Sequence, residues 1–368
     1  MKFLIACGGT SGHINPALAI AGELRRRYPD GDFLFIGTAD KLEADLVPRA
    51  GFAMETIAVS GLSRRKNFAA VKHNAASVSK YLSARRKVRR ILKQFQPNVV
   101  IGTGGYVSAP VLSEAARMKF PTVIHEQNAF AGVTTKLLAP KVDRVLLSFP
   151  LAHPLNCPSE KCVVIGNPVK EDFLNITKES ARSALGIALN ETVVLSYGGS
   201  LGARKINDAW IDFARLAAQD DAMTLCHGAA RDYEYVCSAL SGVNGKRIRV
   251  EEYIYNMPQW MAAADLVIAR SGAMTLTELA ALGKASVLIP SPNVTENHQY
   301  FNAKTYADAG AALLIEEKDL DGKELYRTVC SLVFDRGRLC AMERASRSLS
   351  HPAATAEICD QILRVIPS

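Results

Sequence analysis

The first residues that could carry chemistry are His13 and the glycine-rich stretch before it. Residues 8–12, Gly-Gly-Thr-Ser-Gly, follow a short apolar run and lead into a helical pattern, so a ligand could approach their backbone closely. A histidine at the mouth of a helix can take up a proton near neutral pH. We therefore expect His13 to contact substrate or act as a general base, the alternative being a structural histidine.

A second polar cluster, His-Glu-Gln-Asn at 125–128, directly follows the apolar run 122–124. Four consecutive polar residues at the end of a strand are hard to explain by packing, so we expect contact with a ligand. Glycine-rich turns also follow the apolar runs 98–101 and 193–197. After the second of these turns, free backbone N–H groups together with Ser200 Oγ would suit a pyrophosphate.

Residues 266–302 carry the clearest signal for nucleotide binding. Two apolar runs without helical period read as buried parallel strands, and a helix between them begins near Ser271 and ends at Gly283. Glu278 in this helix could accept hydrogen bonds from both hydroxyls of a ribose. The alternative is that Thr275 and Glu278, three residues apart, form a capping box.

The elements that must position these residues alternate along the whole chain. Short apolar runs and helical patterns predict an α/β protein with parallel sheets, and 368 residues suffice for two domains. We place the boundary at Gly166-Asn167-Pro168, which gives Rossmann-like domains over 1–165 and 166–350 and a C-terminal helix over 351–368 that returns to the first. Because open α/β sheets bind ligands at the carboxyl ends of their strands, we expect the active site in the cleft between the domains.

Basic residues are concentrated between Glu55 and Glu114, where no acidic residue occurs. From 67 to 83, apolar side chains recur every three or four residues beside basic ones, which predicts a helix lying on an anionic membrane surface. The residues of this expected membrane face are Arg64, Arg65, Phe68, Val71, Lys72, Val78, Lys80 and Leu82. A following helix over 84–95 is expected to pack on the core. The segment matches no groove-reading motif, which argues against nucleic acid.

Composition excludes several other classes of protein. No run approaches the roughly 18 apolar residues of a membrane span, and the first residues read as a strand rather than a signal peptide. The 8 cysteines lack metal-ligand spacing and are typical of reduced thiols. No Asp-x-Asp pair stands in the loops expected to line the cleft. We therefore expect no required metal or cofactor, although a loosely bound divalent cation remains compatible with the sequence.

Longer motifs carry a family resemblance: GGTSGHINPALA (8–19), GTGGYVSAP (102–110), HEQNAFAG (125–132), GNPV (166–169), GGSLGA (198–203), RSGAMTLTELAALGKASVLIP (270–290) and HQYFNA (298–303). In this order they resemble the MurG family within glycosyltransferase family 28, N-acetylglucosaminyltransferases that convert lipid I to lipid II in bacterial peptidoglycan synthesis. The resemblance implies the two-domain GT-B fold, with UDP-GlcNAc as donor and lipid I as acceptor. It also implies a peripheral position on the cytoplasmic face of the plasma (inner) membrane, with other cell-wall synthesis proteins as candidate partners.

The resemblance also implies roles for individual residues. The donor-binding positions would be Thr10, Ser11, Gly12, Asn128, Lys170, Ser200, Ile254, Arg270, Ser271, Gly272, Met274, Thr275, Glu278, His298, Gln299 and Asn302. The acceptor-binding positions would be Thr10, His13, Gly104, Gly105, Tyr106 and His125. His13 would be the first candidate for the base, with Glu126 or His125 next.

Two positions depart from the family pattern. Leu201 stands where a glutamine or arginine is common, so phosphate contact would fall to Arg204 or the backbone, and His298 replaces one of two glutamines. The expected reaction is an inverting displacement in which the MurNAc 4-hydroxyl attacks the anomeric carbon of GlcNAc and UDP leaves. The alternatives are a related GT-B transferase with another lipid acceptor, a UDP-GlcNAc epimerase and a non-enzymatic protein that binds anionic lipid or nucleic acid.

Overall fold

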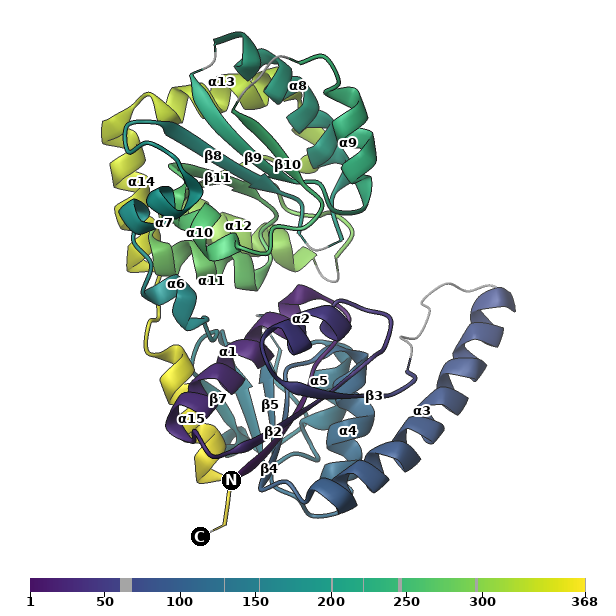
Figure 1. Ribbon diagram of the computed structural model, residues 1–368. Coiled ribbons are helices and arrows are strands. Elements are labelled where there is room, and N and C mark those ends of the chain that lie inside the picture. Colours follow the sequence, from purple (N-terminus) through teal and green to yellow (C-terminus); the bar gives the residue numbers. More distant parts are fainter. Residues whose placement is uncertain are drawn as a thin grey trace. The chain divides into compact units, whose positions relative to one another are not determined.

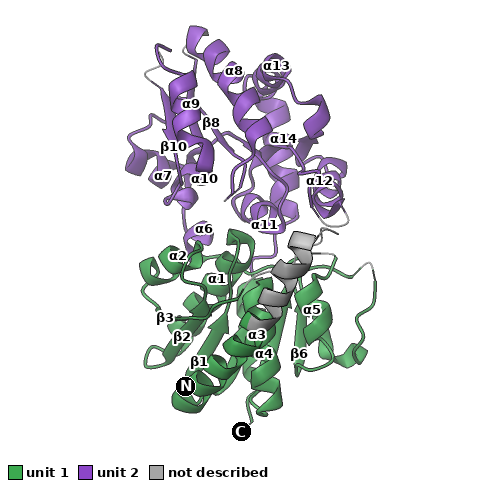
Figure 2. Cartoon of the chain, turned by 90° about the vertical axis from the view of Figure 1, so that its right-hand side faces the viewer, with its two compact units in different colours: residues 1–170, 353–368 green, residues 171–352 purple. Residues whose placement is uncertain are grey.

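The computed structural model describes residues 1–59, 68–128, 130–151, 153–199, 201–220, 222–243, 247–294 and 297–367, with the backbone alone for 68–79 and 220 (Figure 1). The chain forms two compact units (Figure 2). Unit 1 comprises 1–170 and 353–368, and unit 2 comprises 171–352. Across the described part of the chain, none of the helices has the combined length and apolarity that a membrane span requires.

Unit 1 is built on a parallel sheet of 7 strands in the order β3-β2-β1-β4-β5-β6-β7. The strands are β1 (Lys2–Ala6), β2 (Asp32–Gly37), β3 (Ala53–Thr56), β4 (Val99–Gly102), β5 (Thr122–Glu126), β6 (Arg144–Leu147) and β7 (Cys162–Val164). The helices are α1 (Ser11–Arg27), α2 (Glu43–Arg49), α3 (Phe68–Phe95), α4 (Gly105–Arg117), α5 (Val133–Leu138) and α15 (Ala354–Arg364). This is the doubly wound arrangement that the sequence predicts.

Alternate residues of β1 supply the two cores of unit 1. Phe3 and Ile5 pack with α1 and α15 on one face, whereas Leu4 and Ala6 pack with α3 and α4 on the other. Because successive side chains of a strand point to opposite faces, a run that is apolar throughout is buried on both. Helix α15 also pairs with α1 through Arg27, which donates to the carbonyl of Ala356 at 3.0 Å.

Helix α1 begins earlier than the sequence suggests. From the sequence, the turn after β1 is expected to extend through Pro16 and the helix to begin at about Ala17. Instead Thr10 caps it in extended conformation, and the helix runs through Pro16. His13 therefore lies in the first turn of α1 instead of in a loop.

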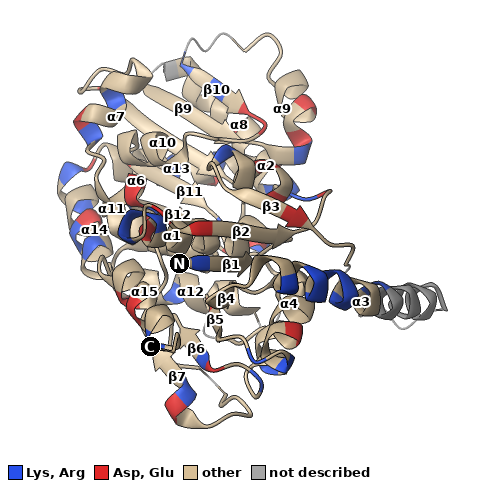
Figure 3. Ribbon diagram, turned by 60° about the horizontal axis from the view of Figure 1, so that its bottom comes forward, with Lys and Arg blue, Asp and Glu red and all other residues tan. Residues whose placement is uncertain are grey.

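Helix α3 is one continuous helix rather than the two expected over 67–83 and 84–95. Its second half is fixed by Glu114 of α4, which accepts hydrogen bonds from Arg85 (2.8 Å), Arg89 (2.7 Å) and Arg117 (2.5 Å). Burial would raise the pKa of Glu114, but these three guanidinium groups lower it to about 2. Glu114, the first acidic residue after Glu55, thus holds α3 against α4. Figure 3 shows the basic residues along α3.

Unit 2 repeats the plan with 6 parallel strands in the order β10-β9-β8-β11-β12-β13. The strands are β8 (Thr192–Tyr197), β9 (Met223–Gly228), β10 (Ile248–Glu251), β11 (Leu266–Ala269), β12 (Ala285–Leu288) and β13 (Ala312–Leu314). The helices are α6 (Glu171–Leu174), α7 (Lys178–Leu185), α8 (Arg204–Asp220), α9 (Tyr233–Ala239), α10 (Met257–Ala263), α11 (Ala273–Leu282), α12 (His298–Asp308), α13 (Gly322–Val333) and α14 (Arg336–Ser348).

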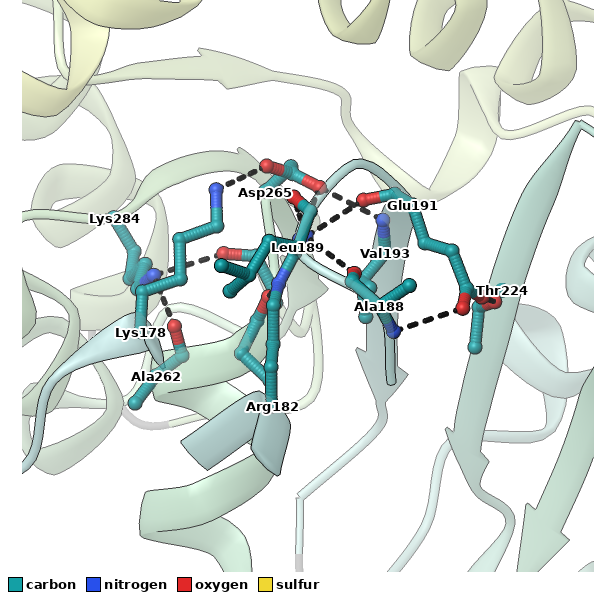
Figure 4. A network of polar contacts seen from close by, with 12 residues as sticks. Lys178, Arg182, Ala188, Leu189, Glu191, Val193, Thr224, Ala262, Asp265 and Lys284 are labelled. Carbon is teal, nitrogen blue, oxygen red and sulfur yellow. Dashed lines mark hydrogen bonds and ion pairs between the residues drawn. The ribbon is translucent and has the colours of Figure 1, made fainter. Parts of the chain in front are cut away.

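A buried polar network holds the amino ends of the central strands of unit 2 (Figure 4). Asp265, just before β11, accepts hydrogen bonds from Arg182 Nη2 and from the N–H of Val193 in β8, both at 2.8 Å. Arg182 also donates to the carbonyl groups of Leu189 and Glu191 at 2.7 and 2.8 Å. A buried charge is tolerated only when paired in this way. The network fixes β8 against β11 at the end opposite the ligand loops.

Both sheets reverse their strand order once, between β1 and β4 in unit 1 and between β8 and β11 in unit 2. Ligands of doubly wound folds bind at the carboxyl ends of the strands at such a switch point. The loops there are 7–10 and 103–104 in unit 1 and 198–203 and 270–272 in unit 2. These are the glycine-rich and polar segments singled out in the sequence.

Candidate active site

His13 has a defined protonation pattern at the switch point of unit 1. Its Nδ1 lies 2.9 Å from the carbonyl oxygen of Thr103 and 3.1 Å from Gln127 Oε1. A carbonyl oxygen only accepts, so Nδ1 carries the proton and Nε2 of the neutral ring carries a lone pair. The half-buried His13 can therefore accept a proton at Nε2.

Two glycines bring the β4 loop against this ring. Gly104 and Gly105 have φ of +94° and +73°, values that favour glycine. A Cβ on Gly104 would lie 2.7 Å from His13 Nδ1, and one on Gly105 would lie 2.4 Å from the carbonyl oxygen of Gly8. Tyr106 follows directly, and a Cβ on Gly9 would lie 3.2 Å from its ring. The loops after β1 and β4 thus meet, with His13 and Tyr106 side by side.

Glu43 of α2 supports the first of these loops. It is fully buried, its Oε2 accepts from the N–H of Gly9 at 3.1 Å, and its Oε1 accepts from Thr38 Oγ1 at 2.7 Å. Burial raises the pKa of Tyr106, and the Glu43 charge adds to this. Sequence reasoning missed Glu43, because no local pattern shows that a helical glutamate turns inward onto a loop more than 30 residues earlier.

The cluster at 125–128 is mostly buried rather than open to a ligand. Glu126 is 4% exposed, and its carboxylate accepts from the N–H of Gly132 (2.9 Å), Thr135 Oγ1 (2.6 Å), and the N–H and Nδ2 of Asn128 (3.2 Å each). His125 is fully buried, and burial lowers its pKa to about 4 despite a hydrogen bond with the carbonyl of Gly166. Glu126 thus shapes the loop before α5, and His125 is neutral at neutral pH.

The amino ends of α1 and α4 lie beside His13 at the same edge. Thr10 occupies the N-cap position of α1, but its side chain makes no capping hydrogen bond. Its carbonyl accepts from the N–H of His13 and Ile14 at 3.0 and 3.2 Å. Ser11 and Gly12 form the half-buried first turn, which contains no acidic residue. An uncapped helix start of this kind suits an anionic group. Lys170 is half-buried and is the last residue of the first segment of unit 1.

In unit 2, helix α11 presents a similar uncapped start. Gly272 is its N-cap in extended conformation, no side chain caps it, and its first turn contains no acidic residue. Ser271 Oγ donates to the carbonyl of Gln299 at 2.7 Å, and the carbonyl of Ser271 accepts from Asn302 Nδ2 at 3.1 Å. Gln299 Oε1 accepts from the N–H of Ser291 at 2.9 Å. These bonds tie the starts of α11 and α12 to the loop after β12, with His298 half-buried as the first residue of α12.

The structure removes the capping-box interpretation of Thr275 and Glu278. The N-cap is Gly272, so Thr275 lies inside the helix and cannot cap it. Glu278 is 7% exposed in α11, next to the buried Met274 and opposite Tyr197 at the end of β8. Burial raises the pKa of Tyr197, and the negative charge of Glu278 raises it further. An acidic side chain thus lies at the switch point of unit 2.

The loop after β8 bends sharply before α8. A Cβ on Gly198 would lie 2.6 Å from the backbone nitrogen of Ala203, and the N–H of Gly202 donates to the carbonyl of Gly199 at 2.9 Å. Ser200 lies outside the described residues. Leu201 is 61% exposed. Ile254, in the loop after β10, is buried against Gly228.

Two arginines that were predicted as candidates for donor contact also have protein partners. Arg270 donates to the carbonyl groups of Ile289 and Pro290 at 3.1 and 3.0 Å and pairs with Glu317. Arg204 bonds Asp208 at 3.0 Å and stacks on the ring of Tyr235 at 3.4 Å. Both guanidinium groups therefore help to hold the loops around them in place.

The expected membrane face is only partly described. Arg64 and Arg65 lie outside the described residues, and the side chains of Phe68, Val71, Lys72 and Val78 belong to the part of α3 described by its backbone alone. Lys80 and Leu82 are both exposed, Leu82 by 53%. Arg86, Arg90 and Lys93 are also exposed along α3 (Figure 3). No group of three or more His, Cys, Asp or Glu side chains that could hold a metal occurs among the residues searched, which are the described ones.

Comparisons with known proteins agree over the length of the chain. The N-terminal domain model of glycosyltransferase family 28 matches residues 3–147, and the C-terminal domain model matches residues 193–358. A protein of Acetivibrio thermocellus is 41% identical over 98% of this chain and 97% of its own length. One from Listeria welshimeri is 40% identical over 100% of both. Both carry the name UDP-N-acetylglucosamine–N-acetylmuramyl-(pentapeptide) pyrophosphoryl-undecaprenol N-acetylglucosamine transferase. A crystal structure of Acinetobacter baumannii MurG superposes with a TM-score of 0.70 at 27% identity, covering 99% of each chain.

Proposed function

This chain belongs to glycosyltransferase family 28, and we propose that it catalyses the reaction for which its relatives are named. It transfers GlcNAc from UDP-GlcNAc to the 4-hydroxyl of MurNAc in lipid I, undecaprenyl-pyrophosphoryl-MurNAc-pentapeptide, forming lipid II and UDP. The observation that carries this conclusion is identity of 40–41% over essentially the full length of both chains. The fold is GT-B, as in the superposed MurG structure.

Unit 2 would hold the donor. The uncapped start of α11, at Ser271 and Gly272, and the glycine-rich loop at Ser200 would receive the diphosphate, because their N–H groups favour anions. Glu278 would accept both ribose hydroxyls, and the backbone of Ile254 would face uracil. The remaining donor contacts are assigned to Thr10, Ser11, Gly12, Asn128, Lys170, Arg270, Met274, Thr275, His298, Gln299 and Asn302. Arg270, Gln299 and Asn302 would act partly by holding the loops in place, since each already has a protein partner.

Unit 1 would hold the acceptor around Thr10, His13, Gly104, Gly105 and Tyr106. His13 takes the proton in this proposal. Its Nδ1–H donates to the carbonyl of Thr103, which leaves the lone pair of Nε2 to accept the proton of the substrate. His125 and Glu126 are assigned supporting roles, since burial and complete hydrogen bonding separate them from a ligand.

The chemical step then balances as a single displacement. The O4–H proton of MurNAc passes to His13 Nε2 while O4 forms its bond with the anomeric carbon of GlcNAc. The bond from that carbon to the diphosphate oxygen breaks, its electron pair leaves with UDP, and the α linkage becomes β(1→4). The backbone N–H groups at the helix starts would stabilise the departing diphosphate without reorganisation.

The exposed part of α3 supports a peripheral position on the anionic cytoplasmic surface of the membrane. Lys80, Arg86 and Arg90 are exposed next to Leu82, and basic residues near such a surface contribute about 1 kcal/mol each to adsorption. Arg85 and Arg89 are held against Glu114 and therefore serve mainly to fix α3, although one carboxylate shared with Arg117 leaves this cluster with a net positive charge. Other cell-wall synthesis proteins are candidate partners at the same surface.

Transfer of radiolabelled GlcNAc from UDP-GlcNAc to a short-chain lipid I analogue tests the activity, with an acceptor-free reaction beside it. Label in a disaccharide lipid only when acceptor is present supports the proposal. Conversion of UDP-GlcNAc to its 2-epimer without acceptor would overturn it in favour of an epimerase. Transfer to another polyprenyl-linked sugar but not to the lipid I analogue would assign a different acceptor.

A further inference from the structure

An unbroken chain of hydrogen bonds runs through unit 1 from Gly166 to His13. His125 Nε2 lies 3.0 Å from the carbonyl oxygen of Gly166, and His125 Nδ1 lies 2.9 Å from Gln127 Nε2. Gln127 Oε1 then lies 3.1 Å from His13 Nδ1, which also contacts the Thr103 carbonyl. Gln127 thus links the buried His125 to the half-buried His13, the proposed base.

Backbone carbonyl groups fix the direction of every hydrogen bond in this chain. The Gly166 carbonyl requires a donor, so His125 Nε2 is protonated and His125 Nδ1 must accept. Gln127 Nε2 supplies that donor and also donates to the carbonyl of His125 at 3.0 Å, which excludes the flipped amide. Gln127 Oε1 must therefore accept from His13 Nδ1–H. The protons are assigned by acceptors that cannot change their role.

The chain is anchored at its far end. Ser148 Oγ donates to Asn167 Oδ1 at 2.6 Å, and Asn167 Nδ2 donates to the carbonyl of Gln127 at 3.3 Å. Gln127 and Asn167 are 2% and 3% exposed. Because these groups are buried and bonded on several sides, rotation of the Gln127 amide would leave buried polar atoms without hydrogen-bond partners, which is unfavourable. The amide is held in one orientation.

We propose that Gln127 is a positioning residue that, together with the Thr103 carbonyl, holds His13 in the Nδ1–H tautomer, with His125 acting through it. This rests on the proposed role of His13 as the base. A fixed tautomer presents the Nε2 lone pair in every molecule instead of a fraction of them. When His13 takes up the substrate proton, its Nδ1–H remains bonded to two neutral oxygens, Gln127 Oε1 and Thr103 O. The neutral amide steadies the ring without adding a charge beside it.

The titratable groups around His13 come from three elements. Tyr106 lies on α4, His125 and Glu126 on β5, and Glu43 on α2 holds the loop before His13. Replacing Gln127 leaves Tyr106, Glu126 and Glu43 in place but also changes the contact at His125 Nδ1. The pH profile of a Gln127 variant is therefore read together with the nitrogen spectrum of His13, which reports on the Gln127–His13 contact itself.

The test combines two variants with one measurement on the unaltered protein. Gln127→Met keeps the volume of the side chain but loses both amide contacts; it should lower kcat about tenfold while leaving KM for UDP-GlcNAc unchanged. Gln127→Glu puts a carboxylate against Nδ1–H, so the acid limb of the kcat/KM profile should move to higher pH. The matched control is Asn207→Leu in unit 2, which removes a buried amide bonded to His227 at 3.1 Å and should leave the acid limb in place.

Nitrogen NMR of the histidine-labelled, unaltered protein reads the tautomer directly, and comparison with the spectrum of His13→Gln identifies the His13 signals. The expected spectrum has His13 protonated on Nδ1 and His125 on Nε2. His13 protonated on Nε2, or Gln127 variants with unaltered kcat and acid limb, would overturn the positioning role. Wild-type turnover in His13→Ala with the expected spectrum would instead remove the base assignment while leaving the hydrogen-bonded chain intact.

Discussion

Replacing Glu278 by glutamine should weaken UDP binding by far more than it weakens binding of 2′-deoxy-UDP. The side chain is 7% exposed within α11, and its negative charge acts on Tyr197 at the end of β8, where the switch point of unit 2 lies. In the proposed complex one oxygen accepts from each ribose hydroxyl. Glutamine keeps the size of the side chain but removes the charge and one acceptor.

The magnitude follows from the two bonds. A hydrogen bond to a charged group contributes about 1.5–3 kcal/mol, and a neutral one about 0.5–1.5 kcal/mol. Replacing two charged bonds by one neutral bond therefore costs about 2.5–4.5 kcal/mol, and at about 1.4 kcal/mol per decade the Kd for UDP should rise roughly 60-fold to a thousandfold. Since 2′-deoxy-UDP lacks one of the hydroxyls, the unaltered protein should bind it more weakly than UDP, and the variant should lose most of that preference.

Isothermal titration calorimetry with both nucleotides measures these effects. Glu324→Gln is the matched control, because Glu324 is an exposed carboxylate of α13 in the same unit and its replacement changes net charge equally. If Glu278→Gln still prefers UDP over 2′-deoxy-UDP as strongly as the unaltered protein does, Glu278 does not contact the ribose.

Three further predictions concern the base, the membrane face and acid stability. His13→Ala should lower kcat about a hundredfold or more while leaving the calorimetric Kd for UDP-GlcNAc unchanged, and full turnover would exclude His13 as the base. Replacing Lys80, Arg86 and Arg90 by glutamate should reduce co-sedimentation with anionic vesicles, and the reduction should be largest at low salt. The control is the same replacement at Lys304, Lys318 and Arg327 of unit 2, which should leave co-sedimentation unchanged. Equal adsorption of the two variants would contradict a role for α3. Burial lowers the pKa of His227 from 6.5 to about 3 and that of His125 to about 4. Below pH 6.5 the unfolded chain therefore binds more protons than the folded protein does. The free energy of unfolding should fall as the pH drops from 6.5 towards 4. His227→Gln should reduce the loss of urea stability between pH 7 and pH 5, the exposed His351→Asn should not, and identical losses in both would refute this origin.

The fold was predictable because its strands are apolar on both faces and end at glycine or polar residues. The side chains from Phe3 to Ala6 pack into two cores, one on each face of the sheet. The strand therefore lacks the alternation of apolar and polar residues that is typical of antiparallel strands with one exposed face. Gly104 and Gly198 mark sharp turns that only a residue without Cβ can make. The element boundaries were predicted less well: α1 begins at Ser11 rather than at about Ala17, and α3 is one helix rather than two.

Only part of the site could be anticipated from the sequence. Motifs located His13, Gly105 and Glu278, but the direction in which a side chain points depends on tertiary packing. The protein partners of Arg270 and Arg204, carbonyl and carboxylate groups, could not be read from the motifs, and donor contacts of these arginines stay predictions. Glu43 was missed and the contact of Gln127 with His13 was not foreseen, because their partners Gly9 and His13 lie far away in the sequence.

The most direct test of the central claim is the stoichiometry and stereochemistry of a single turnover. Enzyme in excess over UDP-GlcNAc is mixed with the lipid I analogue, UDP is counted, and the anomeric configuration of the product is read by proton NMR. The account predicts one UDP for each disaccharide lipid formed and a β(1→4) linkage to MurNAc. An α linkage, a different position on MurNAc, or UDP release without transfer would contradict it.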